Sequence, residues 1–329
     1  MNTSLVTGGA GFIGAHLTNE LINLGHKVIV LDDLSGGYIE NVNKDAIFIE
    51  GSITDYKLLE EIFNKYNFDY VYHLAAYAAE GLSHFIKRFN YNNNLVGSVN
   101  LINESVKHKI KCFVFTSSIA VYGAGQLPMT ESLIPTPEDP YGIAKYAVEQ
   151  ELKVTKEMFG LDYVIFRPHN VYGEYQNIAD KYRNVLGIFM NQLLQEKPLT
   201  IFGDGMQKRA FSYIGDIVPH IAKSVNIKDA YNNVFNIGAD KEYTVKELAE
   251  TIMQVMQTKQ ELKLLPARNE VVNAYSDHSK AKKVFNITDS TTLIDGVTKM
   301  VEWVKKHGAK ETPKFKNIEI TEKLPEVWR

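Results

Sequence analysis

The sequence has 329 residues, of which 45% are apolar and 23% charged, and its formal net charge is −3 at pH 7. This composition is typical of a folded chain of about two domains, and it excludes global disorder. The small net charge provides no electrostatic surface for nucleic acid or for an anionic membrane, so we expect neither as a partner.

In the first half of the chain, short apolar runs alternate with amphipathic segments. Helices are predicted at 15–24 and 55–65, and strands at 1–7, 27–31, 47–50, 70–74, 112–116 and 163–167. Apolar strands that alternate with helices are typical of a parallel sheet covered on both faces. We therefore predict an α/β fold with a Rossmann-type, doubly wound parallel sheet.

The second half of the chain has a less regular pattern and predicts a smaller C-terminal lobe. Glycine and proline separate short elements there, although 244–258 and 292–306 have the pattern of amphipathic helices. We assign residues 1–168 to the sheet domain, to which later segments return, and residues 169–329 mainly to the smaller lobe. The tail, residues 308–329, has no clear periodicity.

A glycine-rich turn, Thr7-Gly8-Gly9-Ala10-Gly11-Phe12-Ile13-Gly14, joins the first predicted strand to the first predicted helix. Glycine allows a tight turn and brings helix N–H groups close to a pyrophosphate, although any tight turn also favours glycine. Asp32 ends the second predicted strand, where a carboxylate can accept hydrogen bonds from a dinucleotide ribose. Asp33 follows, and residues 32–37 contain no Arg or Lys. The pattern therefore predicts binding of NAD rather than NADP.

Tyr141 and Lys145 are four residues apart, which places them on one face of a helix. A phenol with a pKa of about 10 is a weak base at neutral pH unless a nearby cation, here Lys145, stabilises the phenolate. Ser117 and Ser118 follow a predicted strand, at the sheet edge where ligands of α/β folds bind. Either hydroxyl could hold a substrate oxygen while Tyr141 moves a proton. The alternative interpretation of Tyr141 and Lys145 is that they lie on an ordinary surface helix without a catalytic role.

From Thr7 to Ala281, the chain resembles the extended short-chain dehydrogenase/reductase family, in its nucleotide-sugar epimerase and dehydratase branch. The resemblance rests on the glycine-rich turn, on residues 115–123, and on Tyr141 with Lys145. It implies tightly bound NAD, a smaller lobe that binds a nucleotide sugar, and a homodimer. It also implies a catalytic triad of Ser118, Tyr141 and Lys145, with Ser118 chosen over Ser117 by the alignment.

The resemblance further implies a set of cofactor contacts. Leu74-Ala75-Ala76 matches a stretch that lines the cofactor, and Asn94 matches an asparagine near the nicotinamide. The family's adenine-contacting Asp-Ile pair is Ser52-Ile53 here, a departure that weakens one expected hydrogen bond. The implied cofactor-binding residues are Gly8, Gly11, Phe12, Ile13, Gly14, Asp32, Asp33, Ser52, Ile53, Leu74, Ala75, Ala76, Asn94, Tyr141 and Lys145.

For a UDP-sugar, the resemblance assigns diphosphate, uracil and ribose contacts. The implied substrate-binding residues are Ser118, Asn170, Thr200, Phe202, Arg209, Arg268, Glu270 and Ala274. The position that limits the sugar's C2 substituent is Ala274 when counted back from Asp277, and Tyr275 when counted forward from Arg268. We choose Ala274 because Asp277 is the nearer anchor, and a small residue at this position would admit an N-acetyl group. Ala210 and Gly215 stand where the family often has aspartates.

The residues after Ser118 indicate the reaction. The dehydratases that the chain resembles have an acidic pair there and the decarboxylases a glutamate, whereas this chain has Ile119 and Ala120. We therefore predict reversible C4 epimerisation of a UDP-hexose through a transient 4-keto sugar. UDP-N-acetylglucosamine/UDP-N-acetylgalactosamine is the first choice, and UDP-glucose/UDP-galactose is also expected. The alternatives are an epimerase of another nucleotide sugar (a UDP-uronic acid, or a CDP- or dTDP-sugar) and a non-catalytic NAD-sensing module.

Other sequence features indicate compartment and metal content. The single cysteine, Cys112, cannot form an internal disulfide, and no signal-peptide pattern opens the chain. No apolar run reaches the roughly 18 residues of a membrane span. The nine histidines lack metal-ligand spacing. We therefore expect a cytoplasmic protein without a metal.

Overall fold

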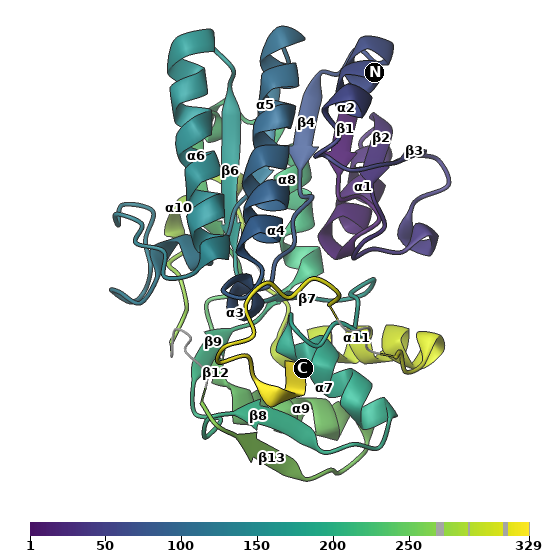
Figure 1. Cartoon of the computed structure of the whole chain (residues 1–329), viewed down its shortest axis with the longest axis vertical. Helices are drawn as coiled ribbons and strands as arrows, with labels where there is room; N and C mark the ends of the chain where they lie inside the picture. The colour runs from purple at the N-terminus through teal and green to yellow at the C-terminus, as the bar shows by residue number, and fades with distance from the viewer. Residues whose placement is uncertain (268–272, 289, 312–314, 329) are drawn as a thin grey trace.

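The computed structural model describes residues 1–267, 273–288, 290–311 and 315–328. Within this part of the chain, seven parallel strands form one sheet in the order β11-β6-β5-β4-β1-β2-β3. Their bounds are β1 Thr3–Thr7, β2 Lys27–Asp32, β3 Ile47–Glu50, β4 Tyr70–His73, β5 Cys112–Thr116, β6 Tyr163–Pro168 and β11 Asn233–Ile237. The predicted α/β class and doubly wound sheet are confirmed. Figure 1 shows this sheet and its helices above the smaller lobe.

Helices pack on both faces of the sheet because successive strand residues point to opposite sides. Val6, Val30 and Val114 face one core, with α1 Phe12–Asn23, α8 Val218–Lys223 and α10 Ser279–Phe285. Leu5, Ile29 and Phe113 face a second core, with α2 Tyr56–Lys65, α5 Gly97–Lys107 and α6 Pro140–Phe159. Strands covered on both faces explain the continuous apolar runs in the sequence.

The first helix begins earlier than the sequence predicts, and the sheet includes a strand from the second half of the chain. Helix α1 begins at Phe12 instead of residue 15, because Gly14 packs against the Gly8 carbonyl inside the first helical turn. Strand β11 comes from the second half of the chain and pairs with β6 over Asn233–Ile237. The sheet domain is therefore completed by a segment far along the sequence.

The smaller lobe contains short paired strands and three longer helices within the described residues. The pairs are β7 Val171–Tyr172 with β10 Ser212–Tyr213, β8 Leu199–Phe202 with β13 Leu262–Leu265, and β9 Lys208–Ala210 with β12 Glu242–Thr244. The helices are α7 Val185–Leu194, α9 Val245–Met256 and α11 Leu293–His307. Among all the described helices, none has the length and apolar character that a bilayer span requires.

The C-terminal tail packs beside two short helices, α3 Glu80–Ser83 and α4 Lys87–Tyr91. Glu319 accepts hydrogen bonds from the backbone N–H groups of Arg88 and Phe89, both at 3.0 Å. Trp328 lies in an apolar cluster with Leu82 of α3. The tail, drawn in yellow in Figure 1, thus joins the edge of the sheet domain to the smaller lobe.

Candidate active site

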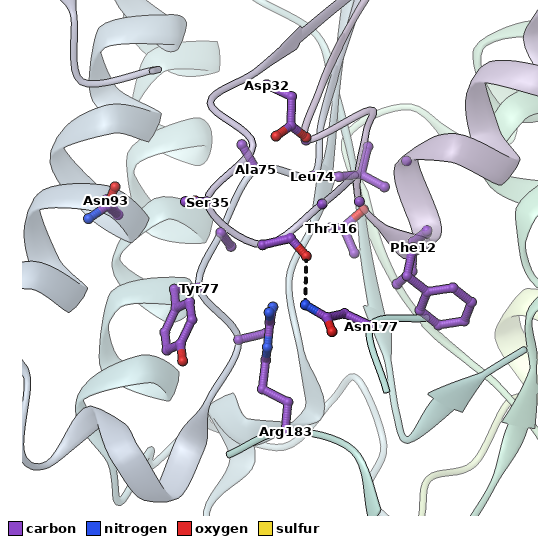
Figure 2. Close-up of a pocket in the computed structure, with 18 of the residues that line it drawn as sticks. Phe12, Asp32, Ser35, Leu74, Ala75, Tyr77, Asn93, Thr116, Asn177 and Arg183 are labelled. Atoms are coloured by element: carbon purple, nitrogen blue, oxygen red, sulfur yellow. Dashed lines mark hydrogen bonds between the residues drawn. The ribbon is translucent and has the colours of Figure 1, made fainter. Parts of the chain in front are cut away.

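A cavity of about 360 Å³ lies at the carboxyl edge of the sheet. Its walls include residues that follow β1, β2, β4, β5 and β6, together with Gln176, Asn177, Arg183 and Asn184. Parallel strands end together at this edge, which is where α/β folds bind ligands. Figure 2 shows Asp32 at one end of the cavity and Tyr77 with Arg183 toward the other.

The glycine-rich turn is packed so closely against neighbouring backbone that two of its positions have no room for a side chain. Gly8 has φ +73°, and a Cβ there would lie 2.8 Å from the backbone nitrogen of Ala75. A Cβ at Gly14 would lie 2.1 Å from the Gly8 carbonyl oxygen. Helix α1 follows with Gly11 as its N-cap, so the N–H groups of its first turn are available to a ligand. This arrangement fits a dinucleotide pyrophosphate.

The carboxylate of Asp32 is held in place at the end of β2. One oxygen accepts from the Ala10 N–H at 3.0 Å and the other from the Leu34 N–H at 2.8 Å. Burial raises the pKa of Asp32, and these hydrogen bonds oppose the rise. A fixed acceptor at this position fits a ribose hydroxyl and disfavours a phosphate.

Most of the predicted cofactor-binding residues line this one cavity. They are Gly8, Gly11, Phe12, Ile13, Gly14, Asp32, Asp33, Ser52, Ile53, Leu74, Ala75, Ala76, Tyr141 and Lys145. Asn94 is not among the described residues that line it. Its side chain accepts from the Tyr77 N–H at 2.9 Å and donates to the Tyr77 carbonyl at 3.1 Å. Asn94 therefore supports the cavity wall, and its neighbour Asn93 lines the cavity (Figure 2).

Ser118, Tyr141 and Lys145 line the same cavity. Helix α6 begins at Pro140, and Asp139 caps it by accepting from the Gly142 N–H at 2.9 Å. The Lys145 ammonium donates to the Thr116 carbonyl at 2.8 Å and lies 5.8 Å from the centre of the Tyr141 ring. The strand end and the helix N-terminus thus bring the three side chains together.

Burial controls the protonation of this pair. It lowers the pKa of Lys145 to about 7 and raises the pKa of Tyr141 above its usual range. The negative charge of Glu80 raises the Tyr141 pKa further, whereas the Ser118 hydroxyl lowers it. A positively charged ligand group in the cavity would favour the phenolate. The site can therefore move a proton between Tyr141 and a bound hydroxyl.

Some of the predicted substrate-binding residues line the cavity, and others lie in the smaller lobe outside its lining. Asn170 lines the cavity with Ser118, and its side chain donates to the Ala210 carbonyl at 3.2 Å. Within the described chain, the cavity lining does not include the smaller-lobe residues Thr200, Phe202, Arg209 and Ala274. Arg268 and Glu270 lie outside the described residues.

Ala274 nevertheless lies near Ser118. It is buried in a cluster with Ile119 and Met129, and Ile119 directly follows Ser118. Tyr275 is only partly buried, and its carbonyl accepts from the Met129 N–H at 3.0 Å. Ala274 forms an isolated β-bridge with Arg209, so the chain is extended there. Successive side chains of an extended segment point to opposite sides, and Ala274 and Tyr275 therefore point in different directions.

Several cavity residues have no counterpart in the sequence prediction. The Arg183 guanidinium lies 4.9 Å from the centre of the Tyr77 ring and pairs with Asp180 at 2.6 Å. Asn177 donates to the Gly36 carbonyl at 3.3 Å (Figure 2). Residues 176–184 come before α7 in an irregular segment, where no periodic signal marks a site.

This fold and cavity define a dinucleotide-binding protein of the Rossmann class. Comparison with known proteins is more specific: the chain belongs to the NAD dependent epimerase/dehydratase family, whose sequence model matches residues 4–238. It is therefore an NAD-dependent enzyme of the nucleotide-sugar epimerase/dehydratase type.

Relatives with named activities cover between 76% and 93% of the chain. A UDP-glucose 4-epimerase of Halalkalibacterium halodurans is 35% identical over 267 residues, which cover 76% of this chain and 79% of the relative. The crystal structure of Thermotoga maritima UDP-glucose 4-epimerase with UDP-glucose matches with a TM-score of 0.88 and 35% identity, covering 93% of this chain and 99% of that one. UDP-N-acetylglucosamine 4-epimerase of Methanobrevibacter ruminantium, in complex with UDP-N-acetylmuramic acid, matches with a TM-score of 0.86 and 32% identity, covering 93% and 98%.

Proposed function

We propose that this enzyme catalyses reversible C4 epimerisation of a UDP-hexose. UDP-N-acetylglucosamine/UDP-N-acetylgalactosamine is the preferred pair, and UDP-glucose/UDP-galactose is also accepted. The main support is that Ser118, Tyr141 and Lys145 line the same cavity as the glycine-rich turn and Asp32. The named activities of the similar proteins agree with a UDP-sugar substrate.

NAD held by the cofactor residues would supply the hydride acceptor and donor for C4, and the 4-keto sugar would have to rotate between the two transfers for C4 to be inverted. Tyr141 removes the proton of the C4 hydroxyl and gives it back when the 4-keto sugar is reduced. Ser118 donates a hydrogen bond to the same oxygen. Lys145 stabilises the Tyr141 phenolate by its positive charge. The cofactor residues proposed above hold NAD through the whole cycle, so no added cofactor is consumed.

The residues after Ser118 support epimerisation over elimination of water. Ile119 is 7% exposed and packs with Val121 and Ala274. An apolar side chain here provides neither the acid nor the base that the acidic pair supplies in the dehydratases. The 4-keto sugar would therefore persist until it is reduced again.

The small side chain of Ala274 supports acceptance of an N-acetyl group. Asn170 and Arg209 are proposed as diphosphate ligands, and Thr200 with Phe202 as uracil contacts. An arginine near a diphosphate is favourable because its planar guanidinium donates to two oxygens at once. We also propose a homodimer, as in the resembling family.

The deciding experiment is an equilibrium assay with UDP-N-acetylglucosamine and, separately, UDP-glucose, without added NAD. Conversion of both to their C4 epimers is expected and would support retained NAD and a pocket that is open at Ala274. Conversion of UDP-glucose alone would show that Tyr275 closes the pocket. If neither is converted while NAD stays bound, the substrate is another nucleotide sugar or the protein is a non-catalytic sensor.

A further inference from the structure

Two histidines far apart in the sequence form a buried pair behind the active-site cavity. The Nε2 atoms of His169 and His278 lie 2.9 Å apart, and their rings are stacked at 25°. The two residues are 3% and 2% exposed. His169 directly precedes Asn170, whereas His278 directly precedes helix α10. Neither histidine has a role in the proposed chemistry.

The hydrogen bonds of the pair require one extra proton. His169 Nδ1 lies 3.0 Å from the Ala210 carbonyl, and His278 Nδ1 lies 2.8 Å from the Asp240 carboxylate. Carbonyl and carboxylate oxygens only accept, so both Nδ1 atoms must carry a hydrogen. The Nε2–Nε2 contact needs a third hydrogen between the rings. Three hydrogens on two imidazoles correspond to one positive charge, because a neutral imidazole carries one.

The surroundings assign that charge to His278. Burial, together with the neighbouring His278, lowers the pKa of His169 to about 3. His169 is therefore neutral and accepts from the protonated His278. The Asp240 carboxylate balances the charge, and hydrogen bonding to His278 keeps its pKa well below the usual range. Lys282 forms a further ion pair with Asp240, and Asp216 lines the same small cavity beside His278.

The pair is connected to the active-site cavity through one carbonyl group. The Ala210 oxygen accepts from His169 Nδ1 and also from the side chain of Asn170, at 3.2 Å. Asn170 has φ +41°, and its carbonyl accepts from the Ser212 N–H at 3.2 Å. Glycine at 238 makes room for this packing, because a Cβ there would lie 2.5 Å from His169 Nε2.

We propose that His169 and His278 are positioning residues that share one buried proton, balanced by Asp240, and thereby hold Asn170 toward the substrate in the cavity. The inference deepens the proposed function, because it takes Asn170 as a diphosphate contact. Loss of the shared proton would leave one of the three hydrogen bonds unmade. The charged groups that face the pair are Asp240, Lys282 and Asp216, whose net charge of about −1 offsets the one positive charge of the pair.

The test measures the Kd of UDP by calorimetry on the NAD-loaded enzyme, so it does not depend on turnover. His278→Leu removes both donors, and we expect UDP to bind about five- to tenfold more weakly, as for one lost hydrogen bond. In His278→Gln, the amide still donates to His169 but carries no titratable proton. We expect the Kd of UDP for His278→Gln to stay within about twofold of the wild-type value at neutral pH. Lys283→Met, on the exposed side of the same helix, is the control.

Nitrogen-15 NMR of the histidine rings in the wild-type enzyme tests the proton directly. We expect His278 to be an imidazolium at neutral pH and His169 to be the neutral Nδ1–H form. When the pH is raised until the shared proton is lost, the Kd of UDP should rise over the same range, and His278→Gln should show no such rise. A neutral His278 at neutral pH would overturn the proposal even if the leucine variant failed to fold.

A double-mutant cycle separates this proposal from the role of Asn170. If the pair acts through Asn170, Asn170→Ala weakens UDP binding and His278→Leu adds little to it. Fully additive effects would overturn the positioning role. If Asn170→Ala leaves the Kd unchanged, the proposed diphosphate contact fails and the positioning role fails with it. UDP binding with intact coupling but no turnover of any nucleotide sugar would instead contradict the proposed function alone.

Discussion

The Ser117 hydroxyl donates a 2.6 Å hydrogen bond to the buried carboxylate of Glu149. Glu149 also forms a buried ion pair with the Arg167 guanidinium at 2.5 Å. The hydroxyl hydrogen of Ser117 is therefore used in a bond to this ion pair and is not available to a ligand. The Ser118 oxygen instead accepts from the Ala120 N–H at 3.1 Å, and its hydroxyl interacts with Tyr141 rather than with a buried carboxylate. This difference distinguishes two adjacent serines that both line the cavity.

Replacement of the two serines should therefore have different effects. Ser118→Ala should lower kcat by about 100-fold or more with little change in stability, because it removes a donor to the reacting oxygen. Ser117→Ala should lower the free energy of unfolding by about 1–3 kcal/mol, because Glu149 loses a buried partner. Kinetics and urea denaturation of both variants measure the contrast. An equal loss of kcat in both would contradict the assignment.

Tyr141→Phe should abolish turnover, with kcat reduced by at least about 100-fold, because the variant has no phenol proton to exchange with the C4 hydroxyl. The ring remains, so bound NAD should be retained and visible in the absorbance of the purified protein. Tyr146→Phe, on the same helix, is the control, since Tyr146 packs near Met129 away from the cavity lining. Full activity of Tyr141→Phe would refute the mechanism.

Gly8→Ala should release NAD. The new methyl group would collide with the backbone of Ala75 and would also strain the positive φ of residue 8. Gly25→Ala is the matched control: Gly25 has φ +81°, but no described atom lies within 4 Å of an added Cβ. It should cost about 1 kcal/mol of stability from backbone strain and keep NAD. Cofactor content after gel filtration measures the difference.

Stability should decrease as the pH falls below about 6.5, in part because of His73. Its ring is fully buried between the hydroxyls of Thr7 and Ser98, both at 2.8 Å. Burial keeps the His73 pKa well below its usual value, so the unfolded chain takes up a proton that the folded chain does not. At pH 5 the loss from this residue is about 2 kcal/mol. Urea denaturation at pH 7 and pH 5 should show a smaller decrease for His73→Gln; an identical decrease would contradict this account.

Glu319→Ala should lower the free energy of unfolding by about 1–2 kcal/mol, because its carboxylate accepts two N–H groups at the start of α4. Glu322→Ala, at an exposed position in the same tail, should have little effect. Denaturation curves of the two variants measure the difference. No difference between them would mean that the tail does not stabilise α4.

The sequence by itself determined the α/β class, six of the sheet strands and the turn at Gly8. Each of these depends on a local pattern: apolar runs of strand length, glycine between a strand and a helix, or a carboxylate at a strand end. The four-residue spacing of Tyr141 and Lys145 is likewise a property of one helix. Such signals can be read without knowing which distant segments meet.

The tertiary structure alone decided which residues meet across the chain. The Asn94 side chain hydrogen-bonds to the Tyr77 backbone instead of lining the cavity. Arg183 lines the cavity from an irregular segment that precedes α7. Strand β11 joins β6, and His169 meets His278 across 109 residues. No local periodicity encodes these contacts, because they depend on the packing of whole elements against one another.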